Sequence, residues 1–510
     1  MPLTPPTGDD LAAIATRYGL HLSPGDLASF AGLLEATIPS YDEVERLYQE
    51  TAPTPPDRPY HRPDPAENDL GAWYVTTDLS TGRDGPLAGW RVAIKDNIEV
   101  AGVPMMNGSA SLEGFVPTRD ATVVTRVLEA GATVAGKAVC EDLCFSGGSH
   151  TSRPGPVRNP WDRSRSAGGS SSGAAVLVAT GAVTGAVGGD QGGSVRIPSA
   201  FSGTVGHKPT HGLVPYTGAF PIENTIDHLG PITRTVEDAA TMLGVLAGPD
   251  GLDHRQRAAL PPRDYLAELH AGVSGLRLGL VEEGFGIPGL SQPGVDEAVR
   301  AAIARLEGAG AKVTTLSVPW HRHGMHVWNV IGTDGTLAQM IDGNAYGFNT
   351  PGLYDPELIA HYARGRRVHA DELSETVKLV ILGGRYALDA NDGRHYAMAR
   401  NLALELRAAY DAALAGVDAL VLPTLPVVAS PLPDPGGSRE DYVARGLEMI
   451  PNTAPFDVSG HPATSVPAGL VDGLPTGLMI VGPRFADEVC LRVAAAYEEA
   501  VGGFPTPPAA

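Results

Sequence analysis

The chain has 510 residues, 43% of them hydrophobic, which is enough for one large globular domain and an additional small one. Its formal net charge of -21 disfavours non-specific binding to nucleic acid or to an anionic membrane surface. The cysteines are few and odd in number, which argues against a disulfide framework and favours a reducing cytoplasm; they are Cys140, Cys144 and Cys490.

The first seventy residues differ in pattern from the rest of the chain. The opening residues lack the basic and apolar regions of a signal peptide. Apolar positions at helical spacing predict three short helices within residues 8–50, one of which begins at Ser23-Pro24. Prolines crowd residues 53–65 and predict an extended linker. We therefore expect residues 1–70 to form a helical segment that packs on the main body or pairs two subunits, and residues 71–510 to form the main domain.

Helical and strand patterns alternate through the main domain. Strands are predicted at 90–100, 132–137, 186–189, 276–280, 312–318, 419–422, 463–468 and 477–481, and helices at 121–130, 174–180, 295–308, 397–415 and 488–501. This alternation predicts an α/β fold with a mixed, largely parallel β-sheet flanked by helices on both sides. Residues 320–395 have weaker periodicity, and we expect them to form the wall or lid of a pocket. No apolar run is long enough to cross a bilayer.

Residues 168–194 contain two Gly-Gly-Ser clusters around a run of small apolar residues. Glycine lets a backbone turn sharply or approach another group closely. Ser170 and Ser194 each follow such a pair, so each hydroxyl can be exposed among free N–H donors. This is the arrangement that an acyl-transfer nucleophile needs.

The strand at 90–100 carries a lysine. Side chains alternate along a strand, so Lys95 should share a side with Asn97, while Asp96 should point away from it. A lysine in an apolar strand is costly unless it is paired or neutral, although a lysine at an exposed strand end fits this segment equally well.

We interpret Lys95, Ser170 and Ser194 as a proton relay. Ser194 attacks a carbonyl carbon, Ser170 takes its proton, and Ser170 passes a proton to Lys95. Backbone N–H groups at the second cluster would stabilise the oxyanion; they belong to Gln191, Gly192, Gly193 and Ser194. The relay needs an uncharged amine, which burial favours, so activity should rise from neutral to alkaline pH.

Other readings of these segments remain open. Residues 169–173 match the G-x-S-x-G nucleophile elbow with Ser171 at its centre, but the preceding segment lacks strand character. Cys140 and Cys144 lie near a histidine without a second ligand pair, so we expect two buried thiols and no metal or cofactor. His207 and His228 are expected to be structural.

Three motifs together resemble the amidase signature family: Lys95-Asp96-Asn97, the Gly-Ser run at 168–173, and GGSVRIP at 192–198. The resemblance spans residues 85–500, with Ser172 where the family usually has glycine and His207 where leucine is more usual. It implies a mixed sheet flanked by helices. It also implies Lys95 as base, Ser170 as bridging serine, often on a cis peptide bond, and Ser194 as the nucleophile that forms the acyl-enzyme.

Within that family, GGDQGGS and KPTHGLVPYTG are similar to the bacterial amidases of nitrile and amide catabolism. The likeness implies an N-terminal helical segment used in dimers, and Asp190 as the residue that shapes the turn before the second serine. It also implies an apolar acyl pocket, for which the candidates, each also suited to a core position, are Phe145, Ile226, Trp328 and Ile450.

We therefore expect a cytoplasmic homodimeric amidase that hydrolyses small aliphatic or aromatic amides without cofactor, nucleic-acid or membrane partner. Three alternatives are the glutamyl-tRNA-dependent amidotransferase component of the same family, which works with tRNA and a partner chain, an amide-forming acyltransferase, and a non-catalytic binding protein on the same fold.

Overall fold

The computed structural model describes residues 3–257, 260 and 263–508, and the chain divides into two compact units, Met1–Pro55 and Pro56–Ala510. The first unit consists of α1 (Gly8–Arg17), α2 (Pro24–Glu35) and α3 (Ile38–Thr51). Thr7 and Ser23 start the first two helices with capping boxes, in which side chain and backbone satisfy each other's polar groups. Among the residues of these three helices only Ala15 is buried.

The proline-rich segment belongs to the second unit. Arg58 forms an ion pair with Asp120 at 2.6 Å, and His61 pairs with Thr76 as an isolated bridge beside the first strand. These contacts explain why the units divide at residue 55, before most of the prolines, and not near residue 70.

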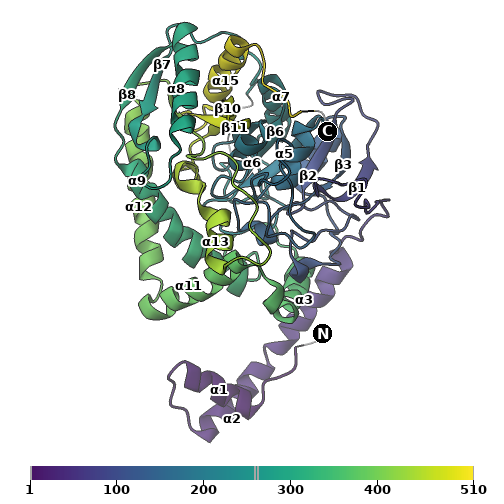
Figure 1. The fold of residues 1–510 in the computed structure, drawn as a ribbon. Helices are drawn as coiled ribbons and strands as arrows, with labels where there is room; N and C mark the ends of the chain where they lie inside the picture. The colour runs from purple at the N-terminus through teal and green to yellow at the C-terminus, as the bar shows by residue number, and fades with distance from the viewer. Residues whose placement is uncertain (1–2, 258–259, 261–262, 509–510) are drawn as a thin grey trace. The chain divides into compact units, whose positions relative to one another are not determined.

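The second unit is built on one 11-stranded sheet of order β1-β3-β2-β4-β6-β5-β10-β11-β9-β7-β8, which runs from β1 at one end to β8 at the other (Figure 1). The strands are β1 (Trp73–Leu79), β2 (Arg91–Lys95), β3 (Thr133–Ala138), β4 (Gly185–Asp190), β5 (Val205–Lys208), β6 (His228–Thr233), β7 (Arg277–Val281), β8 (Lys312–Leu316), β9 (Ala419–Pro423), β10 (Ala463–Val471) and β11 (Leu474–Val481).

The mixed sheet is confirmed, but parallel pairing does not dominate it. β2 is parallel to β3 and β4, and β7 is parallel to β8 and β9, whereas the six other neighbouring pairs are antiparallel. Four of those six pairs involve β1, β5 or β6, strands that the sequence analysis did not predict. β5 (VGHK) and β6 (HLGPIT) contain glycine, proline and buried polar residues, so they lack the usual strand pattern.

Helices cover both faces of the sheet. α5 (Ser172–Ala179) and α6 (Arg196–Ser202) pack against each other and against central strands. A second connected layer packs on the sheet and comprises α4 (Thr122–Glu129), α7 (Val236–Leu246), α8 (Pro293–Gly308) and α15 (Asp487–Val501). None of the helices within the described residues combines the length and apolar character needed to cross a membrane.

The remaining helices come mostly from residues 320–459. They are α9 (Trp320–Val330), α10 (Pro356–Val368), α11 (Glu375–Asn391), α12 (Arg394–Leu414), α13 (Arg439–Leu447) and α14 (Ala454–Ser459). α9 continues into the π-helical segments η4 (Ile331–Gly335) and η5 (Leu337–Asp342), and short 3-10 turns lie at η1 (Ala110–Leu112), η2 (Asp142–Cys144), η3 (Glu282–Gly284), η6 (Ala370–Glu372) and η7 (Ile450–Asn452).

The topology brings the two serine loops to one edge of the sheet. β2 and β4 are adjacent and parallel, so their carboxyl ends, Lys95 and Asp190, lie at the same edge. Ser170 lies just before α5 and Ser194 just before α6, and the Ser171 N–H donates to the Ser194 carbonyl at 3.3 Å. The predicted relay residues therefore converge at this edge.

Candidate active site

Lys95 and Ser170 are fully buried and bonded to each other. Lys95 Nζ donates to Ser170 Oγ at 2.8 Å and to the Gly189 carbonyl at 3.2 Å. The peptide bond between Gly169 and Ser170 is cis, as the resemblance implied. The lysine amine thus lies against a hydroxyl and a carbonyl, both uncharged.

The neighbouring carboxylate is held by a different lysine. Asp96 points away from Lys95, as strand alternation predicts, and its Oδ1 accepts from Lys137 Nζ at 2.9 Å. Its other oxygen accepts the N–H groups of Met106 and Asn107 at 3.0 and 2.8 Å. Within the described part of the chain Lys95 forms no ion pair, so a carboxylate does not hold its charge in place.

Ser194 lies on the wall of a largely apolar pocket. The lining residues are Cys144, Phe145, Ser146, Gly147, Gln191, Gly192, Ser194, Ile197, Ile222, Ile226, Trp328, Leu447 and Ile450. The four predicted acyl-pocket residues come from distant segments, and the structure brings all of them to this one pocket. Two of them, Phe145 and Trp328, stack with ring centroids 6.4 Å apart and an interplanar angle of 28°.

The loop before Ser194 is organised by Asp190. Its carboxylate accepts the N–H of Gly193 at 2.6 Å and the N–H of Val195 at 3.0 Å. This corrects one expectation, because the Gly193 N–H that was predicted to face the oxyanion is already bonded to Asp190. The predicted donors that remain for the oxyanion are the N–H groups of Gln191, Gly192 and Ser194.

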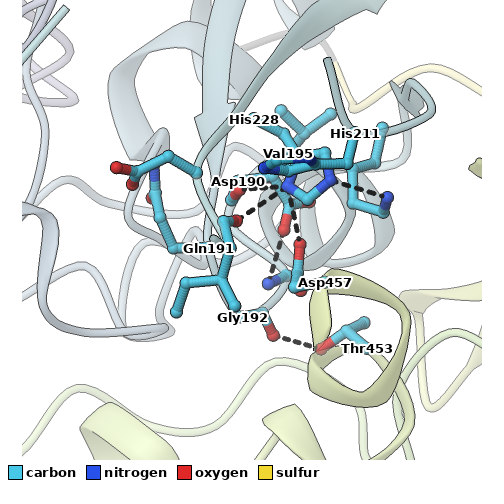
Figure 2. Close-up of polar contacts among 12 residues, drawn as sticks. Asp190, Gln191, Gly192, Val195, His211, His228, Thr453 and Asp457 are labelled. Atoms are coloured by element: carbon cyan, nitrogen blue, oxygen red, sulfur yellow. Dashed lines mark hydrogen bonds and ion pairs between the residues drawn. The ribbon is translucent and has the colours of Figure 1, made fainter. Parts of the chain in front are cut away.

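Two side chains from the C-terminal half hold the carbonyls of the same loop. Trp328 Nε1 donates to the Gln191 carbonyl at 2.7 Å, and Thr453 Oγ1 donates to the Gly192 carbonyl at 2.6 Å, the second bond being visible in Figure 2. The Gln191 side chain donates to Tyr216 Oη at 2.9 Å. Pre-aimed donors stabilise a developing oxyanion only if their backbone is fixed, and these bonds supply that fixation.

A buried charge cluster supports the loop from below. Arg196 bonds to Asp190 at 3.0 Å and to Asp457 at 2.8 Å, and all three side chains are fully buried. Burial opposes the ionisation of Asp190, but the Arg196 guanidinium outweighs it and lowers the pKa of Asp190 to about 2. Burial and the Asp190 charge raise the pKa of Asp457 well above its ordinary value. The cluster therefore carries one ionised and one neutral carboxyl group on a single guanidinium.

The histidines near this cluster have structural contacts. His228 packs edge-on against His211, and its Nδ1 is 2.7 Å from the Ile226 carbonyl (Figure 2). Burial and the charge of Lys208 lower the pKa of His228 well below its ordinary value. His207 bridges Thr464 at 2.8 Å and a buried aspartate of α15.

Ser171, the alternative nucleophile, is engaged in a structural contact. Its hydroxyl donates to the Gly189 carbonyl at 3.1 Å and accepts the Gly189 N–H at 3.2 Å. The hydroxyl is fully buried. The nucleophile elbow is therefore not supported. Among the described residues there is also no group of three or more His, Cys, Asp or Glu side chains suited to a metal ion.

The amidase family model matches residues 64–491. The chain belongs to the amidase family. It is 56% identical, over its whole length and 98% of the relative, to an enantioselective amidase of Rhodococcus rhodochrous. It is 38% identical to the A-type component of glutamyl-tRNA(Gln) amidotransferase from Exiguobacterium sibiricum, over 83% of this chain and 86% of that one.

Solved structures agree with this membership of the amidase family. The peptide amidase of Stenotrophomonas maltophilia has a TM-score of 0.69 at 32% identity and covers 83% of this chain and 85% of its own. The A-type component of glutamyl-tRNA(Gln) amidotransferase from Thermotoga maritima has a TM-score of 0.71 at 32% identity, with 86% and 90% covered. The sequence prediction of an amidase is confirmed.

Sequence reasoning missed several residues that position this amidase site. Arg196 carried a usable signal, because a buried arginine near Asp190 in an apolar stretch must find a carboxylate. Asp457 and Thr453 carried none, because they lie more than 250 residues away from the loop that they contact.

Proposed function

We propose that this chain hydrolyses small aliphatic or aromatic carboxamides to a carboxylic acid and ammonia or an amine. The observation that carries the proposal is the buried bond from Lys95 to Ser170 without a carboxylate on the lysine. Ser194 Oγ attacks the carbonyl carbon, its proton passes to Ser170 Oγ, and the Ser170 proton passes to Lys95 Nζ. Ser170 then protonates the departing amine, and water hydrolyses the acyl-enzyme on Ser194.

The substrate class follows from the pocket beside Ser194. Its walls are mainly aromatic and branched aliphatic side chains, which favour an uncharged acyl group. The stacked pair Phe145–Trp328 offers a flat surface for an aromatic acyl group. Since the Rhodococcus relative is an enantioselective amidase, chiral amides belong in the substrate panel as paired enantiomers.

The test is a panel of aliphatic, aromatic and peptide amides assayed with the wild type and with Ser194→Ala. The wild type should release acid and show an acyl adduct on the peptide that contains Ser194 by mass spectrometry. Ser194→Ala should show neither. An adduct on Ser171, or equal turnover by both proteins, would contradict the assignment of the nucleophile.

One specific observation favours a second function, that of the A-type component of glutamyl-tRNA amidotransferase. That component from Thermotoga maritima superposes on this chain with a TM-score of 0.71. The role would require tRNA and a partner chain. Amide hydrolysis by the purified chain alone would disfavour this role, whereas activity that appears only with a partner complex would favour it.

We further propose that the N-terminal unit pairs two copies of the chain. Its helices expose large apolar side chains on every turn, namely Ile14, Tyr18, Phe30, Leu33, Tyr41, Val44 and Leu47. A matched pair of variants, Leu33→Glu with Val44→Glu, should convert a dimer to a monomer in light scattering, while Glu45→Gln should not. A cytoplasmic location is part of the proposal and is supported by three cysteines that are free and buried.

A further inference from the structure

The pocket wall contains a thiol that the relay does not use. Cys144 lies beside Ser194 in the pocket lining and is 4% exposed. Its Sγ is 3.2 Å from Asn107 Oδ1, and the Sγ of Cys140 is 3.4 Å from the same oxygen. Two thiols therefore converge on one amide oxygen at the edge of the substrate pocket.

The backbone is held in an unusual conformation to place this thiol. Leu143 and Cys144 have φ angles of 47° and 60°, in the left-handed region that L-residues rarely adopt. The N–H of Leu143 donates to the Asn107 carbonyl at 3.0 Å, and the N–H of Cys144 donates to the Glu141 carbonyl at 2.8 Å. The Nδ2 of Asn107 is buried and has no partner among the described residues. Such strain persists where a site requires it.

The surroundings make the two thiols unequal. Burial raises the pKa of Cys144, but the hydrogen bond from Cys140, the Lys95 charge and the hydrogen bonds of Ser170 and Lys95 outweigh it and lower that pKa below its ordinary value. Burial and the Cys144 thiol raise the pKa of Cys140. Cys144 is therefore the better nucleophile, and Cys140 is placed to react second.

We propose that Cys144 is an oxidation site for hydroperoxides that enter the acyl pocket, with Cys140 as the resolving thiol. The Cys144 sulfur attacks one peroxide oxygen, an S–O bond forms, the O–O bond breaks, and the leaving oxygen takes a proton as water or alcohol. The Cys140 sulfur then attacks the sulfenic sulfur, an S–S bond forms, and the hydroxyl leaves as water with the Cys140 proton. The peroxide gains two electrons and the thiol pair loses two.

Oxidation at this place stops turnover, and this consequence rests on the proposed amidase function. The disulfide withdraws Cys144 from Lys95, Ser170 and the pocket wall and breaks both thiol contacts to Asn107. Reduction by a dithiol restores the starting state, since both cysteines keep their sulfur at the thiol oxidation level.

Cys490 provides an internal control. It is fully buried, its Sγ is 3.7 Å from the Pro462 carbonyl, and it is absent from the pocket lining. Burial raises its pKa well above the ordinary value, so it should react slowly.

The experiment treats the full-length wild type, Cys140→Ser, Cys144→Ser, Cys144→Ala and Cys490→Ser with hydrogen peroxide and follows thiol peptides by mass spectrometry. The wild type and Cys490→Ser should lose two hydrogen atoms on the peptide with residues 140–144 and regain them, and their activity, with dithiothreitol. Cys140→Ser should give a dimedone adduct on Cys144. The fraction of activity left after treatment should be higher in both Cys144 variants.

Oxidation of Cys490 as fast as Cys144, or inactivation of both Cys144 variants at the wild-type rate, would overturn the proposal. The mass readout needs no amide turnover. A failure of the proposed amidase function is therefore separate from a failure of the oxidation site.

Discussion

Among the residues that the structure describes, three lysines are fully buried, Lys95, Lys137 and Lys208, and their partners differ in kind. Lys137 bonds to the carboxylate of Asp96 at 2.9 Å. Lys208 donates to the His461 carbonyl at 2.6 Å and lies 3.3 Å from His228 Nε2. Lys95 donates to the hydroxyl of a serine. Burial alone therefore does not mark a catalytic lysine.

The difference lies in what each partner can do with a proton. A carboxylate fixes the ammonium form, and a backbone carbonyl only accepts a hydrogen bond. A serine hydroxyl can give its proton to the amine and take another from Ser194. The three lysines thus divide into a structural pair, a structural cation and a base, and each assignment can be broken by a separate variant.

The largest effect is expected for Lys95→Met. It removes the acceptor at the end of the relay, and general base catalysis contributes roughly 10²–10⁴-fold in rate, so kcat should fall by about that factor. Steady-state kinetics on an amide that the wild type cleaves measures it, with thermal unfolding as the check on folding. A loss below tenfold would contradict the role of Lys95 as base.

Lys137→Met should affect stability instead of chemistry. It leaves Asp96 charged and unpaired in a fully buried position, which costs about 3–5 kcal/mol of the free energy of unfolding. Urea unfolding measures this loss. The matched control is Asp96→Asn with Lys137→Met, which removes both charges and should recover part of the loss. No recovery in the double variant would contradict the ion-pair explanation.

Lys208 should make stability depend on alkaline pH. Burial lowers its pKa from 10.5 to about 8, so the folded protein holds this proton less tightly than the unfolded chain. Between pH 8 and 10.5 the unfolded chain binds more protons, and the free energy of unfolding should rise with pH by about 3 kcal/mol from this group. Below pH 8 the lysine is charged in both states, and the contribution is constant.

The measurement for Lys208 is urea unfolding at pH 8 and pH 10, for the wild type and for Lys208→Met. Other groups titrate in the same range, so the difference between the two proteins isolates the lysine. The wild type should gain stability relative to Lys208→Met as pH rises. An unchanged difference would mean that Lys208 keeps its ordinary proton affinity in the fold.

The sequence predicted the relay because its residues lie in short, local patterns. Gly-Gly-Ser repeats and strand alternation placed Ser170, Ser194, Lys95 and the outward turn of Asp96 without knowledge of the fold. The same reasoning missed that Lys137 takes the carboxylate, because that pairing depends on β3 lying beside β2. It also placed the Gly193 N–H toward the oxyanion, since nothing local shows where the Asp190 carboxylate turns.

The strands show the same limit. β2, β4 and β9 are apolar and short, and their positions were predicted within a few residues, although 90–100 was drawn too long for β2. β5 and β6 are held in the sheet by neighbours on both sides, so their own composition carries little strand signal. Long-range pairing overrides local propensity at such positions.

The smallest effect tests whether the loop beside Lys95 can be loosened while all three lysines stay in place. Thr453→Val removes the hydroxyl that donates to the Gly192 carbonyl at 2.6 Å and leaves that carbonyl buried without this bond. A lost hydrogen bond of this kind is worth about 1 kcal/mol, so kcat should fall by roughly five- to tenfold while KM changes little. Thr453→Ser keeps the hydroxyl and should restore most of the rate. If Thr453→Ser were as slow as Thr453→Val, packing of the threonine methyl against the loop would explain the effect, and the hydrogen bond would have no part in it.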